Sequence, residues 1–269
     1  MIPPSVQPWA LCDPRRLRAV RGVLTDIDDT LTTGGVIPMG VVAALAALRA
    51  SSVPVIAITG RPMGWSRAIV VDAPLAAVVA ENGAVALVAN DQGHVDIDYV
   101  QGAAERAANE VRLRDTSARI LREVPGTALS RDSAGRVTDI AIDHSEFARL
   151  GPDAIERVVA LMREDGMQAT VSSIHVNGWF GSHTKLSGAD WVVRSLFGRD
   201  LGAERDAWIY VGDSTNDQQM FASFPLSVGV ANLLDFADRL TQWPAFITQH
   251  DRGRGFIEVA EALLAVRGR

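Results

Sequence analysis

Short runs of β-branched and aliphatic residues alternate along this chain with amphipathic helical patterns. The runs predicted to be strands cover residues 20–27, 53–59, 75–80, 207–211, 226–230 and 245–248. The Ala- and Leu-rich segment 40–50 and the segment 256–266 are predicted to be helices. Strands that alternate with helices are typical of a parallel sheet with helices on both faces. The predicted fold class is therefore α/β.

The middle of the chain follows a different order. The predicted elements are a hairpin over 84–100, a charged helix over 103–123, a hairpin turning at 132–135, a helix over 153–165 and a strand pair over 167–180. From the first helix onward, the order helix–strand–strand occurs twice, which indicates a small α+β domain of αββαββ type inserted into the sheet domain. We therefore predict a core of residues 1–83 and 182–269 and an inserted domain of residues 84–181.

Composition narrows the classes of partner. The 269 residues carry a net charge of -6, so the composition gives no sign of the basic face that nucleic acid or an anionic membrane surface requires. The single cysteine, Cys12, excludes internal disulfides and cysteine-based metal clusters. No signal peptide is recognised, and no apolar run approaches the roughly 20 residues that span a bilayer. We expect a cytoplasmic enzyme or binding protein with a small-molecule partner.

Polar side chains follow several of the predicted strands. Ligands of open α/β sheets bind beyond the carboxyl ends of the strands, so these residues are the first candidates for a site. The residues at the strand ends are Asp26, Asp28 and Asp29, then Thr59 and Gly60, then Glu81 and Asn82, and finally Asp213, Asn216 and Asp217.

Five carboxylates lie at just two of these strand ends. Helix capping explains one aspartate at a strand–helix junction but not five at two junctions. Unpaired carboxylates gathered at a sheet edge are costly, so a cation is expected among them. Oxygen ligands without neighbouring histidine or cysteine favour Mg²⁺. The sequence therefore predicts a magnesium site.

The same residues resemble the four motifs of the haloacid dehalogenase (HAD) superfamily, in order and over essentially the whole chain. Asp26-Ile27-Asp28-Asp29-Thr30 is similar to the first motif, Thr59 to the second, Lys185 to the third, and Gly212-Asp213 with Asn216-Asp217 to the fourth. The αββαββ order resembles the type IIB cap of the Cof-like, sucrose-phosphatase and mannosylphosphoglycerate-phosphatase groups. This resemblance implies a phosphatase with a Rossmann-like core and a cap that sets substrate specificity.

The resemblance also implies roles for individual residues. Asp26 would attack phosphorus to form an aspartyl-phosphate, and Asp28 would act as general acid and base. The phosphate-binding residues would be Thr59, Gly60, Lys185 and Asn216. Mg²⁺ would be held by Asp26, Asp213, the backbone carbonyl of Asp28, and Asp217 either directly or through water. Lys185 departs from the family pattern because Leu186 replaces the usual glycine, so the alternative for Lys185 is a solvated surface lysine.

The last predicted cap strand offers candidate substrate contacts. Side chains alternate between the two faces of a strand, so His175, Asn177 and Trp179 share one face. If the cap helices cover the opposite face, with Ile174 and Val176, then these three residues look down on the reaction centre. The alternative is an exposed polar face with Trp179 at the domain interface.

The function predicted from these residues is Mg²⁺-dependent hydrolysis of a small phosphomonoester, a sugar phosphate or phosphorylated glycoside, through an aspartyl-phosphate. Two alternatives stay open. One is a phosphomutase of the phosphomannomutase type, and the other is a binding protein for a phosphorylated ligand without turnover. The sequence fixes neither the substrate nor the oligomeric state.

Overall fold

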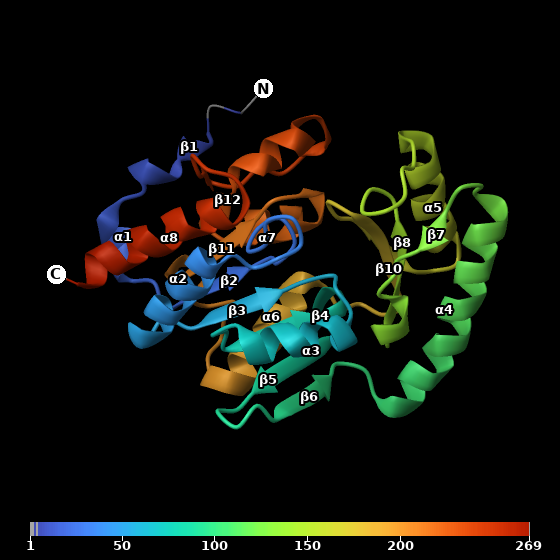
Figure 1. The fold of residues 1–269 in the computed structure, drawn as a ribbon, viewed down its shortest axis with the longest axis horizontal. Helices are drawn as coiled ribbons and strands as arrows, with labels where there is room; N and C mark the ends of the chain where they lie inside the picture. The colour runs from blue at the N-terminus through green and yellow to red at the C-terminus, as the bar shows by residue number, and fades with distance from the viewer. Residues whose placement is uncertain (1–2, 4, 269) are drawn as a thin grey trace.

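The computed structural model describes residue 3 and residues 5–268, and its core is a largely parallel β-sheet (Figure 1). Within this range the strands of the core sheet lie in the order β1 (Gln7–Pro8), β13 (Phe246–Ile247), β12 (Leu226–Gly229), β11 (Trp208–Gly212), β2 (Gly22–Thr25), β3 (Val55–Ile58), β4 (Ala77–Ala80), β5 (Val85–Ala89) and β6 (Val95–Tyr99). In this order across the sheet, each strand from β1 as far as β4 pairs parallel with the next one. The central strands are buried on both faces, which explains their uninterrupted apolar sequences.

Helices cover both faces of this sheet, as predicted for the α/β class. One face packs against α1 (Pro14–Arg18), α2 (Met39–Ala50), α3 (Met63–Asp72) and α8 (Arg252–Arg267). The other packs against α6 (Lys185–Phe197), α7 (Gln218–Ser223) and the 3₁₀ segment η6 (Ala231–Arg239). Among the helices of the described residues, none is long and apolar enough to cross a membrane.

A second, antiparallel sheet lies beside the core, and we call it with its two helices the cap (Figure 1). Its strands lie in the order β7 (Ala128–Leu129), β8 (Asp139–Asp143), β10 (His175–Trp179) and β9 (Gln168–Val171). Helices α4 (Ala103–Glu123) and α5 (Pro152–Glu164) enclose an apolar core with one face of this sheet. Val176 belongs to that core, as predicted, so the neighbouring residues His175 and Asn177 point to the opposite face.

The predicted start of the inserted domain at residue 84 is wrong. The hairpin over 84–100 forms β5 and β6, and both strands extend the core sheet, because β5 pairs antiparallel with β4. Val85 and Leu87 are fully buried in the same apolar cluster as α2 and α8. The hairpin thereby covers the edge of β4, which would otherwise expose unpaired backbone groups. The helices and strands of the cap run from Ala103 to Trp179.

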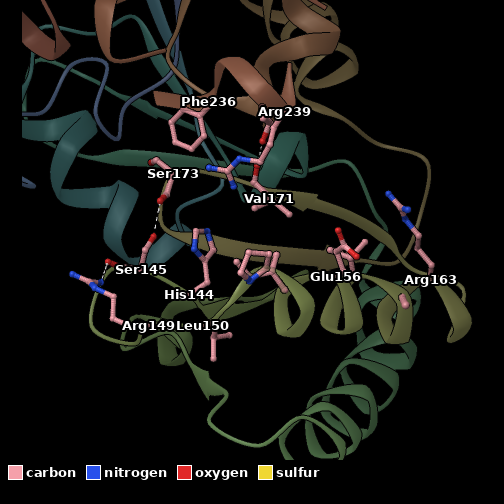
Figure 2. Close-up of a pocket in the computed structure, with 15 residues that line it drawn as sticks. His144, Ser145, Arg149, Leu150, Glu156, Arg163, Val171, Ser173, Phe236 and Arg239 are labelled. Atoms are coloured by element: carbon pink, nitrogen blue, oxygen red, sulfur yellow. Dashed lines mark hydrogen bonds between the residues drawn. The ribbon is translucent and has the colours of Figure 1, made fainter. Parts of the chain in front are cut away.

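The two connections between core and cap lie side by side. Gln101 in the first donates a hydrogen bond from Nε2 to the carbonyl oxygen of Phe180 in the second, over 2.8 Å. Trp179 stacks on His183 with ring centroids 5.7 Å apart and donates from Nε1 to the carbonyl oxygen of His183. Away from these linkers, the cap and core face each other across a cavity between α5 and η6 (Figure 2).

The second connection, after β10, contains His183, and burial controls the protonation of this histidine. Burial lowers the pKa of His183 to about 4. The unfolded chain binds this proton near pH 6.5 and the folded chain only near pH 4, so the folded state loses stability as the pH falls through that interval.

We therefore expect His183→Gln to reduce the acid sensitivity of the protein. Between pH 7 and pH 4.5 the native chain should lose about 2 kcal/mol more of its free energy of unfolding than the variant, as measured by urea denaturation. The exposed His94 provides the control, because His94→Gln should keep the native pH dependence. Equal losses in the native chain and His183→Gln would contradict this assignment.

Candidate active site

Asp26 and Asp213 follow neighbouring parallel strands at the same edge of the sheet. Asp26 is the first residue after β2 and Asp213 the first after β11, and these two strands pair with Thr25 opposite Val211. Asp217 is the last residue of the 3₁₀ segment η5 (Thr215–Asp217), which follows β11. One carboxylate oxygen from each of the three aspartates lies within 4.8 Å of the others, and all three residues are buried. The structure thus brings together three of the five acidic residues that the sequence singled out at these strand ends, whereas Asp28 and Asp29 pair with arginines instead.

Lys185 places an ammonium group between two of these carboxylates. Its Nζ donates to Asp26 Oδ1 over 2.7 Å and to Asp217 Oδ1 over 2.8 Å. Lys185 is the first residue of α6, whose start is fixed by reciprocal hydrogen bonds between Thr184 and Ser187. The side chain is only 4% exposed, which excludes the alternative of a solvated surface lysine. Burial opposes its charge, but the two carboxylates outweigh burial and raise the pKa of Lys185.

Both carboxylate oxygens of Asp217 accept hydrogen bonds. Its Oδ1 also accepts from the hydroxyl of Tyr210 over 2.5 Å. Its Oδ2 accepts from the backbone N–H groups of Asp213 and Ser214, over 3.0 and 3.1 Å. These four contacts suit a residue that orients Lys185 and the loop after β11 better than a direct metal ligand.

The charges around Asp213 fit a divalent cation. Burial, followed by the negative charges of Asp26 and Asp217, raises the pKa of Asp213 well above its ordinary value. Burial likewise raises the pKa of Asp26, although Lys185 opposes the shift. Three buried carboxylates therefore share one buried ammonium, and a second source of positive charge would stabilise them. Because every candidate ligand here is an oxygen, the residues fit Mg²⁺.

Asp28 lies two residues beyond Asp26, and its carboxylate is bound by Arg61. Arg61 Nε donates to both oxygens of Asp28 over 3.0 Å, and Nη2 donates to Oδ1 over 2.9 Å. The carboxylate of Asp28 is not part of the three-aspartate cluster. Any metal contact from Asp28 would therefore have to come from its backbone carbonyl, as the resemblance implied.

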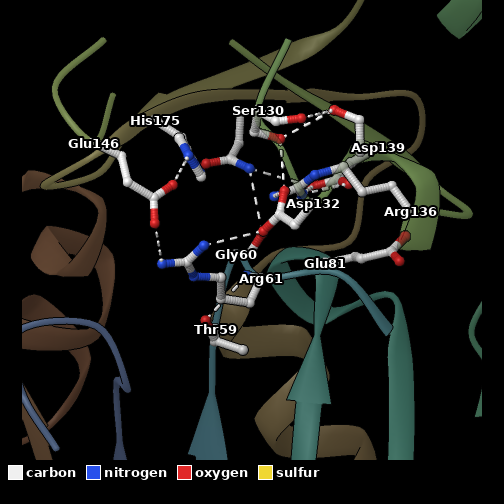
Figure 3. A network of polar contacts seen from close by, with 12 residues as sticks. Thr59, Gly60, Arg61, Glu81, Ser130, Asp132, Arg136, Asp139, Glu146 and His175 are labelled. Carbon is white, nitrogen blue, oxygen red and sulfur yellow. Dashed lines mark hydrogen bonds and ion pairs between the residues drawn. The ribbon is translucent and has the colours of Figure 1, made fainter. Parts of the chain in front are cut away.

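Arg61 also connects the core to the cap. It donates from Nη1 to Asp132 Oδ2 over 3.1 Å and from Nη2 to Glu146 Oε1 over 3.0 Å, and the contact with Glu146 is drawn in Figure 3. Its side chain is only 9% exposed. Glu146 in turn contacts His175 Nε2 over 2.9 Å. One guanidinium thus joins the candidate acid–base residue of the core to two cap carboxylates.

Further hydrogen bonds close the cap over Gly60. Its carbonyl oxygen accepts from Arg136 Nη1 over 2.9 Å and from Asn177 Nδ2 over 3.3 Å. A Cβ atom at Gly60 would lie 3.3 Å from Asn177 Oδ1 and 3.2 Å from Asn82 Oδ1, so this close approach favours glycine. Beside it, the buried carboxylate of Glu81 accepts from the backbone and side chain of Thr138, both over 2.6 Å.

The space that the cap leaves beside Asp26 is very small. Its walls are formed by Asp26, Asp28, Thr59, Gly60, Arg61, residues 172–175, Asn177 and Asn216. Its volume is about 10 Å³, close to the least that holds one water molecule. A ligand much larger than a water molecule can therefore occupy this space only if the residues around it move.

Most of the predicted site residues meet around this space. Thr59, Gly60, Asn216, His175 and Asn177 line it together with Asp26 and Asp28, while Lys185 reaches Asp26 from the start of α6. Trp179 does not line it. That residue shares the strand face of His175 but lies at the linker, where it contacts His183, and it lines a separate cavity of about 270 Å³ together with Lys185 and Asn216.

Sequence reasoning missed four residues that shape the site. Arg61 carried a usable signal, because it directly follows the polar strand end at Thr59 and Gly60. Asp132 lies at the predicted hairpin turn, where an aspartate indicates only turn geometry, and Glu146 lies in a cap loop that shows no recognisable pattern. Tyr210 lies within an apolar strand, where a tyrosine indicates only core packing.

Comparison with known proteins identifies the fold. No family model matches the sequence, and no curated protein matches it. A sucrose-phosphatase from Synechocystis sp. PCC6803, solved with sucrose and phosphate, aligns with a TM-score of 0.62 at 16% identity, over 90% of this chain and 97% of that one. This chain has the HAD fold.

Two other solved structures align with this chain over a similar range. A sugar phosphatase of HAD subclass IIB aligns with a TM-score of 0.61 at 16% identity, over 91% of this chain and 98% of that one. A protein from Thermoplasma acidophilum aligns with a TM-score of 0.67 at 15% identity and the same two coverages. The match to the subclass IIB enzyme spans the cap as well as the core, so the HAD fold here includes an inserted α+β unit.

The contacts of Arg61 with Asp28, Asp132 and Glu146, which we call the Arg61 cluster, predict that core and cap stabilise each other. Arg61→Gln leaves Asp28 and Glu146 without their cation, so we expect the free energy of unfolding to fall by about 3 kcal/mol. Glu146→Gln alone should cost less, because its side chain is partly exposed. The double variant should lose about 1 kcal/mol less than the sum of the two single variants.

Urea denaturation at neutral pH measures all three values. Arg114 on α4 is the matched control, because it is exposed and its ion pair is with the adjacent Asp115 on the same helix. Arg114→Gln should change the stability by less than about 0.5 kcal/mol. Strictly additive effects of Arg61→Gln and Glu146→Gln would show that the contact between Arg61 and Glu146 contributes nothing to stability.

Proposed function

We propose that this protein is a Mg²⁺-dependent phosphomonoester hydrolase with Asp26 as its nucleophile. The observation that carries the proposal is the setting of Asp26. Asp26 lies at the carboxyl end of the parallel strand β2, beneath the cap. Its Oδ1 accepts a hydrogen bond from the buried ammonium of Lys185 over 2.7 Å. Its Oδ2 accepts no hydrogen bond from the described residues, which leaves that oxygen available for attack on phosphorus.

The proposed reaction has two displacement steps. In the first, Asp26 Oδ2 forms a bond to phosphorus, the bond to the leaving oxygen breaks, and that oxygen takes a proton from Asp28. In the second, a water oxygen attacks phosphorus while Asp28 takes its proton, and the bond between phosphorus and Asp26 breaks. The products are an alcohol and inorganic phosphate, and both aspartates return to their starting states.

The remaining residues of the site would stabilise charge on the phosphoryl group. Lys185 lies next to Asp26 and would donate to a phosphoryl oxygen, together with the Thr59 hydroxyl and backbone N–H groups near Gly60. Asp26, Asp213 and the carbonyl oxygen of Asp28 would hold Mg²⁺. The bound ion would supply positive charge beside the phosphoryl oxygens.

Proton transfer at Asp28 requires its contact with Arg61 to loosen. Arg61 donates to both oxygens of Asp28, so in the closed arrangement this carboxyl group is fully engaged. Movement of the cap would draw Asp132 and Glu146 away from Arg61 and rearrange the whole cluster. The same movement admits the substrate, so entry of substrate and release of the acid–base group would be linked.

The polar residues of the cap support a sugar phosphate as substrate. His175, Asn177, Asp132 and Glu146 gather beside the closed site and are suited to hydrogen bonds with hydroxyl groups. The names of the sucrose-phosphatase and the subclass IIB sugar phosphatase support the same substrate class. A mutase would need free cap cations beside the closed catalytic space for a second phosphate, whereas Arg136, the cap arginine bound to Gly60 there, is already bound to Asp139 and Asp132.

The proposed function predicts phosphate release from a panel of phosphorylated sugars in the presence of Mg²⁺. Asp26→Asn should lower kcat by on the order of 10⁴-fold or more, because the amide cannot form the covalent intermediate. Removal of Mg²⁺ with a chelator should abolish turnover until the ion is restored. Asp206→Asn, at an exposed position, is the control and should leave kcat unchanged.

Two results would overturn the proposal. One is robust turnover by Asp26→Asn. The other is interconversion of hexose 1-phosphate and hexose 6-phosphate without phosphate release, which would identify a mutase instead.

A further inference from the structure

A second cavity between cap and core is much larger than the closed catalytic space. It has a volume of about 750 Å³, which is within the range of small-molecule sites. One wall comes from the cap, through α5 and the segment before it, and the other comes from η6 and Thr215 of the core. Figure 2 shows Phe236 and Arg239 on the core side and Leu150 and Glu156 on the cap side.

The cavity adjoins the catalytic space at one residue. Ser173, in the turn between β9 and β10, lines both spaces. Ser145 Oγ holds this turn by donating to the carbonyl oxygen of Ser173 over 2.7 Å. Thr215, which lies between Asp213 and Asp217, donates from Oγ1 to the carbonyl oxygen of Val171 over 2.7 Å. The walls of the cavity are therefore connected to the loop that carries the acidic cluster.

The interior of this cavity is mainly apolar. Leu150, Ile155, Val159 and Phe236 contribute side chains from both walls. An apolar lining with a few polar groups is typical of sites that bind small organic molecules.

The charged residues of the cavity are mostly positive. Arg149, Arg163 and Arg239 line it, and Glu156 is the single acidic residue among its walls, which leaves two net positive charges in a chain of net charge -6. Within residue 3 and residues 5–268, no carboxylate lies within 4.0 Å of these three guanidinium groups. Arg239 lies over the Phe236 ring, 4.9 Å from its centroid, and Arg149 donates to the carbonyl oxygen of Ala148.

We propose that this cavity binds a small organic anion with an apolar body. The arginines would bind its carboxylate, sulfonate or phosphate group, for which guanidinium groups are well suited, and the apolar walls would bury the rest. Because the walls belong to both cap and core, the bound anion would connect them. This cavity is separate from the catalytic space beside Asp26. The proposal that it binds an anion does not depend on the proposed function.

A pair of fluorescent probes tests this chemistry. The first, 1-anilinonaphthalene-8-sulfonate, combines an aromatic body with a sulfonate, and the second, N-phenyl-1-naphthylamine, has the same body without the charge. The native chain should bind the sulfonate at one saturable site and the uncharged probe at least about tenfold more weakly. The sulfonate should also raise the melting temperature, because it binds the folded state.

Substitution of the arginines locates the site. The double variant Arg149→Gln/Arg239→Gln should weaken sulfonate binding about tenfold without changing the binding of the uncharged probe. Arg114→Gln/Arg254→Gln removes the same charge from exposed positions outside the cavity and should bind the sulfonate as the native chain does.

Three results would overturn the proposal. The first is equal binding of the two probes, which would mean a purely apolar surface. The second is unchanged sulfonate binding in Arg149→Gln/Arg239→Gln. The third is the absence of saturable binding with no rise in melting temperature.

Discussion

The buried ammonium of Lys185 is the interaction on which the rest of the site depends. It joins Asp26, which follows β2, to Asp217, which follows β11, and it comes from the first residue of α6, where the chain returns from the cap. Three separate segments of the core are thereby held at one point. The ammonium neutralises only part of the charge of the three carboxylates, which makes the cluster costly alone and suited to a divalent cation.

The sequence was sufficient to predict much of the core and the order of the cap elements. Adjacent parallel strands end at one edge, so the polar residues after β2 and β11 could be expected to meet there. The position of the hairpin β5–β6 could not be predicted in the same way. Its alternating pattern indicates strands but does not say which edge they pair with, and the choice depends on the burial of Val85 and Leu87 against the core helices.

Contacts between cap and core were the least predictable part of the site. The period of a strand places Trp179 on the face of His175, yet its neighbour is His183 of the linker, because the strand ends where the chain leaves the cap. The partners of Arg61 are far away in sequence, and Asp132 and Glu146 lie in loops without a repeating pattern. Such contacts depend on how the two units meet, which local sequence does not encode. They nevertheless control access to Asp26, because they close the space above it.

Titration of Mg²⁺ into the native chain and into Asp213→Asn, followed by calorimetry and thermal unfolding, tests the central claim most directly. Without metal at neutral pH, Asp213→Asn should unfold at a higher temperature than the native chain, because it removes a buried carboxyl group whose ionisation is opposed by burial and by Asp26 and Asp217. Mg²⁺ should bind the native chain and raise its melting temperature but should fail to do either in the variant. Equal binding of Mg²⁺ by both proteins, or no binding by the native chain, would contradict the account of a carboxylate cluster built around a divalent cation.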